Sequence, residues 1–162
     1  MTRRIPLVVT VLVLLGVASA SLAWAQTPAA PDGVEGEVLI VLARREAGTI
    51  DPRLSTVPAL RRSPFDMFHS MSLLSSPRVH LRVGQAEVVP LPNGRRVRLV
   101  LREMTSSGRF RLQLSINRPG QRDYLPEMNV VVSPGDPVFI AGQSHENGTL
   151  VIGIRLGQRP DA

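Results

Sequence analysis

Apolar and polar residues alternate along much of the chain from Phe65 onward. Apolar side chains occupy every second position of the segments 78–83, 96–102 and 109–116. Successive side chains of a strand point to opposite faces, so this period of two predicts strands with one buried and one solvated face. The turn sequences between the segments are Pro92-Asn93-Gly94, Ser106-Ser107-Gly108, Arg118-Pro119-Gly120, Ser133-Pro134-Gly135 and Asn147-Gly148. Together they predict an all-β fold, an antiparallel β-sandwich or open barrel of about eight to nine strands.

The segments 96–102 and 109–116 suit a hairpin whose register follows from the pattern. If Ser106 and Ser107 form its tip, all the apolar residues fall on one face, as a half-buried hairpin requires. A shift by one residue would mix the faces. The predicted pairs are Leu101 with Leu112, Leu99 with Leu114, and Val97 with Ile116.

Two further elements precede these strands. Residues 37–43 form a continuous apolar run that is short for a helix and rich in β-branched residues, which predicts a strand covered on both faces. Asp51-Pro52 has the composition of a helix start, because Asp caps the first turn and Pro is tolerated at its first position. Pro58 interrupts that helix. We expect one short kinked helix over 52–62.

The first 25 residues have the pattern of a secretory signal peptide: two arginines, an apolar stretch and the motif Ala23-Trp24-Ala25. An uncleaved membrane anchor is the alternative, because the 21 residues from Ile5 to Ala25 could just cross a bilayer. We expect residues 26–33 to be a flexible lead-in and 34–158 to be a single β-sandwich domain. The protein is then exported, to the periplasm, the outer membrane or the cell exterior.

Composition excludes several classes of function. The 162 residues include 19 arginines, no lysine and 13 acidic residues, which gives a formal charge of +6. The chain has no cysteine, so disulfides, Cys-ligated zinc, thiol catalysis and an acylated lipoprotein cysteine are excluded. Export argues against nucleic acid as a partner, despite the positive charge.

Three groups of residues carry candidate chemistry, and none has the pattern of an enzyme site. Ser144, His145 and Glu146 are adjacent, whereas a catalytic triad converges from separate segments. His69, His80 and His145 lack neighbours at metal-ligand spacing. Glu35 and Glu37 would share a face of the first strand, but glycosidase sites usually add Trp or Tyr to hold the sugar. We expect no catalysis, no metal and no cofactor.

Five arginines form a candidate anion-binding surface on the exposed face of the predicted hairpin. They are Arg96, Arg98, Arg102, Arg109 and Arg111. The register places Arg102 opposite Arg111, a like-charge pair that destabilises a sheet. This surface could bind lipid head groups, lipopolysaccharide phosphates or an acidic partner. Alternatively, Glu87 and Glu103, or solvent and salt, neutralise it.

The closing hairpin is apolar on both predicted faces. A type I′ turn at Asn147-Gly148 would pair Phe139 and Ala141 with Leu156 and Ile154. The candidate partner surface on the opposite face is Val138, Ile140 and Val151. A sandwich leaves one face of each sheet solvated, so something must cover these residues. The helical segment 52–62 is one candidate, and a second subunit or an envelope partner is the other.

The chain also contains an apolar first strand, then Asp51-Pro52-Arg53-Leu54, then Phe65 and Phe68, then paired strands, and finally Pro137–Gly142 with Leu150-Val151-Ile152. This order resembles a class of small exported β-proteins of Gram-negative bacteria. The closing hairpin is similar to the gate-region hairpins of outer-membrane secretins. Neither resemblance supplies a catalytic residue. We expect an exported, non-enzymatic binding or structural accessory protein of a bacterial envelope or secretion assembly, which binds an envelope protein or a second copy. The alternative is a binder of anionic lipid or polysaccharide through the arginines.

Overall fold

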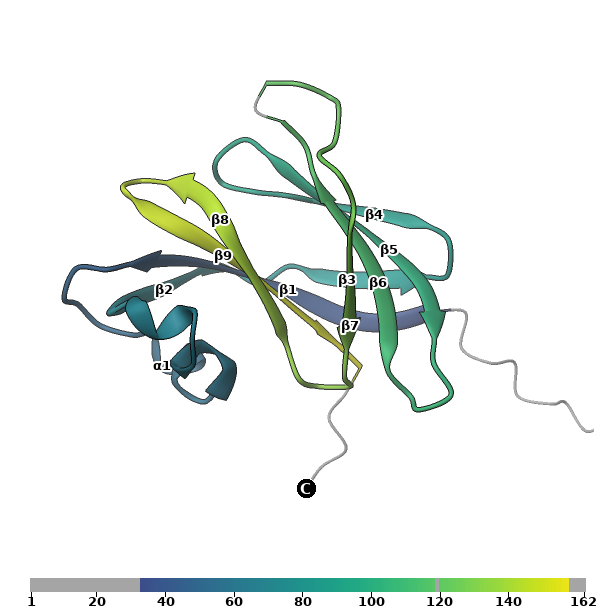
Figure 1. Cartoon of the computed structure of the whole chain (residues 1–162), viewed down its shortest axis with the longest axis horizontal. Helices are drawn as coiled ribbons and strands as arrows, with labels where there is room; N and C mark the ends of the chain where they lie inside the picture. Colours follow the sequence, from purple (N-terminus) through teal and green to yellow (C-terminus); the bar gives the residue numbers. More distant parts are fainter. Residues whose placement is uncertain (1–32, 119, 158–162) are drawn as a thin grey trace, which may run out of the picture.

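The computed structural model describes residues 33–118 and 120–157. Within these residues nine strands form two antiparallel sheets packed face to face (Figure 1), so the expected β-sandwich is confirmed. The first sheet contains β2 (Ser70–Ser75), β1 (Gly33–Arg44), β9 (Gly148–Leu156) and β8 (Val138–His145), with β3 (Arg78–Arg82) also paired to β1. The second sheet contains β4 (Ala86–Pro90), β5 (Arg96–Met104), β6 (Phe110–Ile116) and β7 (Met128–Val132). The expected signal peptide 1–25 and residues 26–32 of the lead-in lie outside the described residues.

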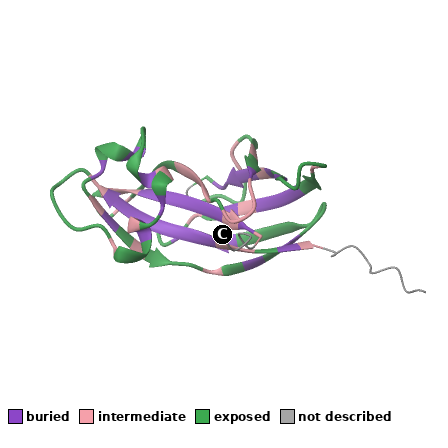
Figure 2. Ribbon diagram, turned by 90° about the horizontal axis from the view of Figure 1, so that it is seen from below, coloured by how far each residue is buried: buried purple, intermediate pink, exposed green. Residues whose placement is uncertain are grey.

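β1 is the central strand of the first sheet. Its first half pairs with β3, its second half pairs with β2, and β9 lies along its other side. β2 and β3 thus form one edge that is interrupted at Pro77, whose carbonyl oxygen accepts the Val38 N–H at 2.9 Å. Most of β1 and β9 is buried (Figure 2). The expected strand covered on both faces is confirmed, because Ile40 packs between the sheets and Val41 packs under the helical segment.

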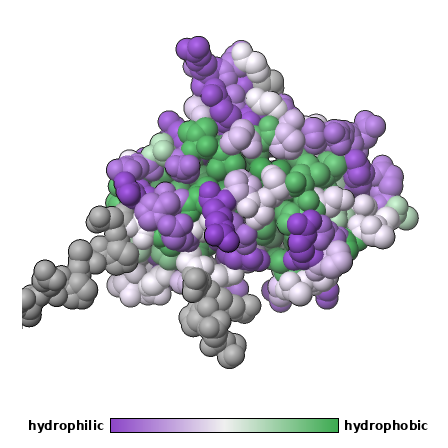
Figure 3. Space-filling model, turned by 180° about the vertical axis from the view of Figure 1, so that it is seen from behind, coloured by the Kyte–Doolittle hydropathy of each residue, from purple (hydrophilic) through white to green (hydrophobic). Residues whose placement is uncertain are grey.

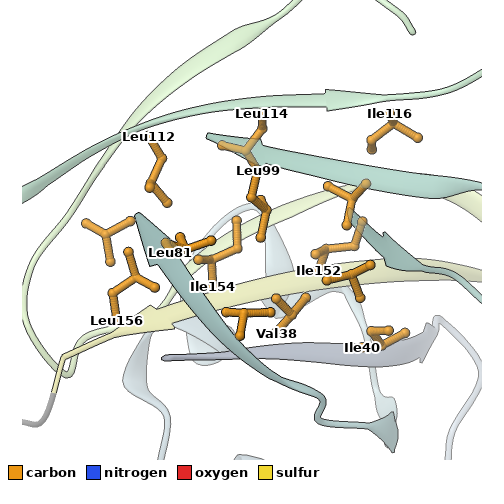
Figure 4. Close-up of a cluster of buried hydrophobic side chains, with 14 of the residues drawn as sticks. Val38, Ile40, Leu81, Leu99, Leu112, Leu114, Ile116, Ile152, Ile154 and Leu156 are labelled. Atoms are coloured by element: carbon orange, nitrogen blue, oxygen red, sulfur yellow. The ribbon is translucent and has the colours of Figure 1, made fainter. Parts of the chain in front are cut away.

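Alternate residues of both sheets form the main core. Figure 4 shows the side chains of the two sheets pointing toward each other. Fully buried members are Leu81, Leu99, Leu101, Leu112, Leu114, Leu150, Ile152, Ile154 and Leu156. The removal of these aliphatic side chains from water is the principal force that holds the sheets together.

A second, smaller core lies on the outer face of the first sheet. Its cover is a chain of short helical turns: α1 (Pro52–Ser55), η1 (Pro58–Arg61) and η2 (Phe65–Met67). We call this stretch together with Phe68, residues 52–68, the helical cover. It packs Leu54, Val57, Leu60, Phe65 and Phe68 against Leu39, Val41, Ala43, Met71 and Val151. The sequence correctly predicted helical structure interrupted at Pro58 but wrongly predicted a strand from Phe65. A 3₁₀ turn aligns residues three apart, and this spacing brings both Phe65 and Phe68 onto the sheet.

Asp51 caps α1 as expected. Its Oδ1 accepts the Arg53 N–H at 3.0 Å, and its two carboxylate oxygens accept from the Arg53 guanidinium at 3.0 and 2.7 Å. These hydrogen bonds lower the pKa of Asp51 from 3.8 to about 2. The same contacts raise the pKa of Arg53 above its ordinary value.

The β5–β6 hairpin has the predicted core register with a different tip. All three predicted apolar pairs, including Leu99 with Leu114, are confirmed. The tip is a three-residue loop that ends at Gly108, where φ is 74°, so the register slips by one residue. A bulge between Leu101 and Glu103 compensates for the slip. The predicted pairing of Arg102 with Arg111 is therefore wrong, because Glu103 takes the position opposite Arg111.

The β8–β9 hairpin also differs from its prediction. The two turn residues are Glu146 and Asn147, with φ of 43° and 59°, so the turn begins one residue earlier than expected. A bulge near Gly142, where φ is 128°, adds a second shift. Phe139 consequently pairs with Gly153 and Ala141 with Val151, instead of with Leu156 and Ile154.

Candidate functional site

The structure separates Val151 from Val138 and Ile140, the other two residues of the predicted partner surface. Val151 is fully buried beneath the helical cover. Val138 pairs with Ile154 and Ile140 with Ile152, and both are half-buried against the core between the sheets. The prediction of one shared face is wrong, because the earlier turn and the bulge shift β8 relative to β9. The helical segment does cover Val151, as expected if this segment, and not a second subunit or an envelope partner, is the cover.

Ile140 instead lines a crevice at an open edge of the sandwich. β7 and β8 diverge from their connection, and the two sheets part between them (Figure 1). The resulting cavity measures about 230 Å³. Its lining consists of Ile116, Leu125, Pro126, Met128, Ile140, Ala141, Gly142, Gln143 and Ile152, and we call it the edge crevice. Apolar residues dominate this lining. Met128 is exposed and Ile140 half-buried, whereas the core residues Ile116 and Ile152 are buried.

Polar groups mark one end of the edge crevice. Arg95, in the turn between β4 and β5, donates from its guanidinium to the side-chain oxygen of Gln143 on β8. Asn93 of the same turn donates to the Ser144 carbonyl at 3.4 Å. These contacts join the tip of one sheet to the edge of the other. Gln143 therefore connects the apolar crevice to a cationic side chain.

Arg95 also lines a second groove. It has a volume of about 400 Å³, and its described lining includes Arg95, Arg96 and Arg122 and no acidic residue. Buried Asn117 holds this region: its Oδ1 accepts the Arg96 N–H at 2.5 Å, and its Nδ2 donates to the Gln121 carbonyl at 2.9 Å. We call this the arginine groove.

The five arginines of the predicted anion-binding surface do gather on the outer face of the second sheet, but two of them are ion-paired. Arg98 contacts Glu127 at 2.7 Å, and its guanidinium carbon lies 4.7 Å from the centre of the Tyr124 ring. Arg111 contacts Glu103 at 3.1 Å. The sequence reasoning anticipated Glu103 and missed Glu127, which comes from a segment with no periodic pattern.

The remaining three arginines of that surface have no acidic partner among the described residues. Arg102 donates to the side-chain oxygen of Gln113, and the Gln113 amide nitrogen donates to Glu127. The Arg109 Nε donates to the Ser107 Oγ at 3.3 Å. Arg96 is exposed on this face and also lines the arginine groove. The surface therefore keeps a positive balance.

Glu35 and Glu37 share the outer face of the first sheet, as predicted. Glu35 Oε1 lies 2.5 Å from His80 Nδ1, and Glu37 Oε1 lies 2.5 Å from Arg155 Nη1. Ser76 also donates to Glu37 at 2.7 Å. Each carboxylate is held by its own cross-strand neighbours. This arrangement is that of a polar strand surface with paired charges.

The remaining candidates do not converge. Ser144 and His145 are successive residues of β8 and so point to opposite faces of the hairpin, with His145 Nε2 at 3.6 Å from Glu146 Oε1. Residues 33–118 and 120–157 contain no cluster of three metal-ligating side chains. Within the same ranges no helix has the length and hydropathy needed to cross a bilayer.

Figure 3 shows apolar patches between polar side chains on the rear face, and eight large apolar residues of the described ranges are more than 40% exposed. Exposure alone therefore does not single out a site, whereas the edge crevice combines a cavity with an apolar lining and a polar end. Compared with protein-family models, with curated proteins and with solved structures, the chain shows no significant match.

Proposed function

We propose that this chain is an exported, non-enzymatic binding protein that serves as an accessory or structural component of a bacterial envelope or secretion assembly. The edge crevice is its binding site. The observation that carries this proposal is the cavity between the start of β7 and β8, where the apolar side chains of Met128 and Ile140 are open to solvent beside the core. Binding sites are typically concave and mainly apolar, with a few polar groups that orient the ligand.

Met128 provides the position from which this proposal can be tested. Its side chain lies at the crevice and is 41% exposed, whereas Val131 of the same strand is 46% exposed on the outer face of the second sheet. A photo-reactive amino acid is placed at each position in the full-length chain inside the cell. We expect an adduct from position 128 and none from position 131, detected by mass spectrometry of the purified protein.

A crevice-filling substitution supplies the control. Ile140→Trp in the chain that carries the photo-reactive residue at position 128 should abolish the adduct, provided that circular dichroism shows an unchanged fold. Equal adducts from positions 128 and 131, or an adduct that persists when the crevice is filled, would contradict the proposal.

A second function is favoured by the unpaired arginines on the second sheet. Arg96, Arg102 and Arg109 form no ion pair with the described residues, so this face could hold anionic lipid or polysaccharide. Exposed charges act through a screened field, so vesicle binding of this kind should weaken steeply with salt. The test compares Arg96→Gln/Arg109→Gln with Arg78→Gln/Arg82→Gln, a double variant of equal charge on the first sheet. Equal vesicle binding by the two would reject this second function.

A further inference from the structure

The volume of the edge crevice restricts which ligands can enter it. Its volume of about 230 Å³ lies below the range of about 300–1,000 Å³ that is usual for drug-sized ligands. Among its lining residues Ile116 and Ile152 are buried, Ile140 is half-buried and Met128 is exposed. An unbranched aliphatic chain suits such a small apolar space, whereas a fused-ring lipid exceeds it.

The charge at the polar end restricts the other half of the ligand. Arg95 is half-buried, and its bond to Gln143 links the arginine groove directly to the crevice. Three arginines line that groove without an acidic residue among its described lining. A planar guanidinium binds a carboxylate through two parallel hydrogen bonds, which a neutral hydroxyl cannot match.

We infer that the edge crevice and the arginine groove together bind a medium-chain fatty acid. The aliphatic chain occupies the crevice, and the carboxylate lies at Arg95 with Arg96 and Arg122 nearby. This inference rests on the proposed function, since it names the ligand of the same site.

Dodecanoate, used below its micelle concentration, is the probe for the full-length exported protein. Dodecanol tests the chain without the charge, and acetate tests the charge without the chain. We expect dodecanoate to bind in isothermal titration calorimetry, dodecanol to bind at least about tenfold more weakly, because it lacks the charge-assisted hydrogen bonds, and acetate not to bind.

Two variants separate the parts of the site. Arg95→Gln should weaken dodecanoate binding about tenfold and leave dodecanol unchanged, while Arg82→Gln, an exposed arginine on β3, should change neither. Ile140→Trp should abolish the binding of both. If Ile140→Trp fails to fold, Met128→Trp fills the rim of the same crevice from a more exposed position. Val88→Trp, exposed on β4, is the matched control.

The outcomes distinguish this inference from the proposed function. Equal affinities for dodecanoate and dodecanol, or no effect of Arg95→Gln, would overturn the role of the arginine groove. Binding to anionic vesicles without binding of monomeric dodecanoate would overturn the fatty-acid assignment and favour a membrane surface. A crosslinked adduct at position 128 in a protein that binds no dodecanoate would leave the proposed function standing and reject the fatty acid.

Discussion

Ile140 on β8 and Val151 on β9 lie on opposite faces of the first sheet. Ile140 pairs with Ile152 and packs toward the second sheet beside the edge crevice. Val151 pairs with Ala141 and is completely buried under the helical cover. A charge introduced at these two positions therefore meets two different environments.

Val151→Glu should destabilise the domain by several kcal/mol. The new carboxylate would be buried with neither water nor a cationic partner beside it. Ile140→Glu should cost less, because its carboxylate can reach solvent through the edge crevice, and the domain should still unfold cooperatively. Urea unfolding followed by circular dichroism measures both. Val131→Glu, exposed on β7, is the control and should change the free energy of unfolding by less than about 0.5 kcal/mol. Equal losses at positions 140 and 151 would contradict the register of β8.

The two faces of β6 should respond differently to truncation. Leu114→Ala removes a side chain that is 1% exposed and should cost about 2–4 kcal/mol, as a core cavity does. Gln113→Ala removes exposed hydrogen bonds to Arg102 and Glu127 and should cost no more than about 1 kcal/mol. Urea unfolding of both variants measures the difference. A larger loss of unfolding free energy for Gln113→Ala than for Leu114→Ala would contradict the assignment of Leu114 to the buried face of β6.

The apolar pattern was sufficient to predict the class of fold and the core register of one hairpin. Leu99 and Leu114 face each other because each must be buried, and burial of alternate residues leaves few registers open. For the same reason the run containing Ile40 and Val41 could be recognised as a strand covered on both faces.

The irregularities could not be predicted in the same way. The bulge at Arg102 lies beside the mainly polar residues near the hairpin tip, and the β8–β9 hairpin has apolar residues on both faces. At neither place does the apolar pattern fix the register. The edge crevice arises from the divergence of β7 and β8, and Leu125 and Pro126 reach it from a segment without periodicity. Its link to Arg95 depends on a contact with Gln143, a residue far away in sequence and on the other sheet.

A double-mutant cycle can test the bulge of β5. Glu103 lies opposite Arg111 at 3.1 Å, with both side chains about half exposed. Their coupling should be favourable by about 0.2–1 kcal/mol, the range of exposed ion pairs. Arg102 and Arg111 should show no repulsive coupling, because the bulge moves Arg102 away from the opposite position. A repulsive coupling between Arg102 and Arg111, with no coupling between Glu103 and Arg111, would contradict the bulge. It would support the hairpin with a two-residue tip that the sequence predicted.

The position of the β8–β9 turn predicts opposite effects on stability for substitutions at Gly148 and Glu146. A Cβ on Gly148 would lie 2.8 Å from Leu42 Cδ1 and 2.9 Å from the Ala43 carbonyl oxygen, so Gly148→Ala should cost about 1–3 kcal/mol through overpacking. Glu146→Gly should be neutral or stabilising, because φ there is 43°, a conformation that glycine adopts without strain. Thermal unfolding of both variants checks this. A tolerated Gly148→Ala would contradict the close contact of Gly148 with Leu42 and Ala43 on β1.

Asp51 should make the stability of the helical cover depend on pH. Hydrogen bonds from the Arg53 side chain lower the pKa of its carboxyl from 3.8 to about 2 in the folded protein. Because the folded pKa is the lower one, the contribution of the ionised carboxylate is complete above pH 3.8 and disappears as the pH falls through about 2. The difference in unfolding free energy between the natural protein and Asp51→Asn should therefore be constant at neutral pH and shrink across this window. Arg53→Gln should return the pKa of Asp51 toward 3.8 in an NMR titration, and an Asp51 carboxyl that already titrates there with Arg53 present would show that the two side chains do not interact.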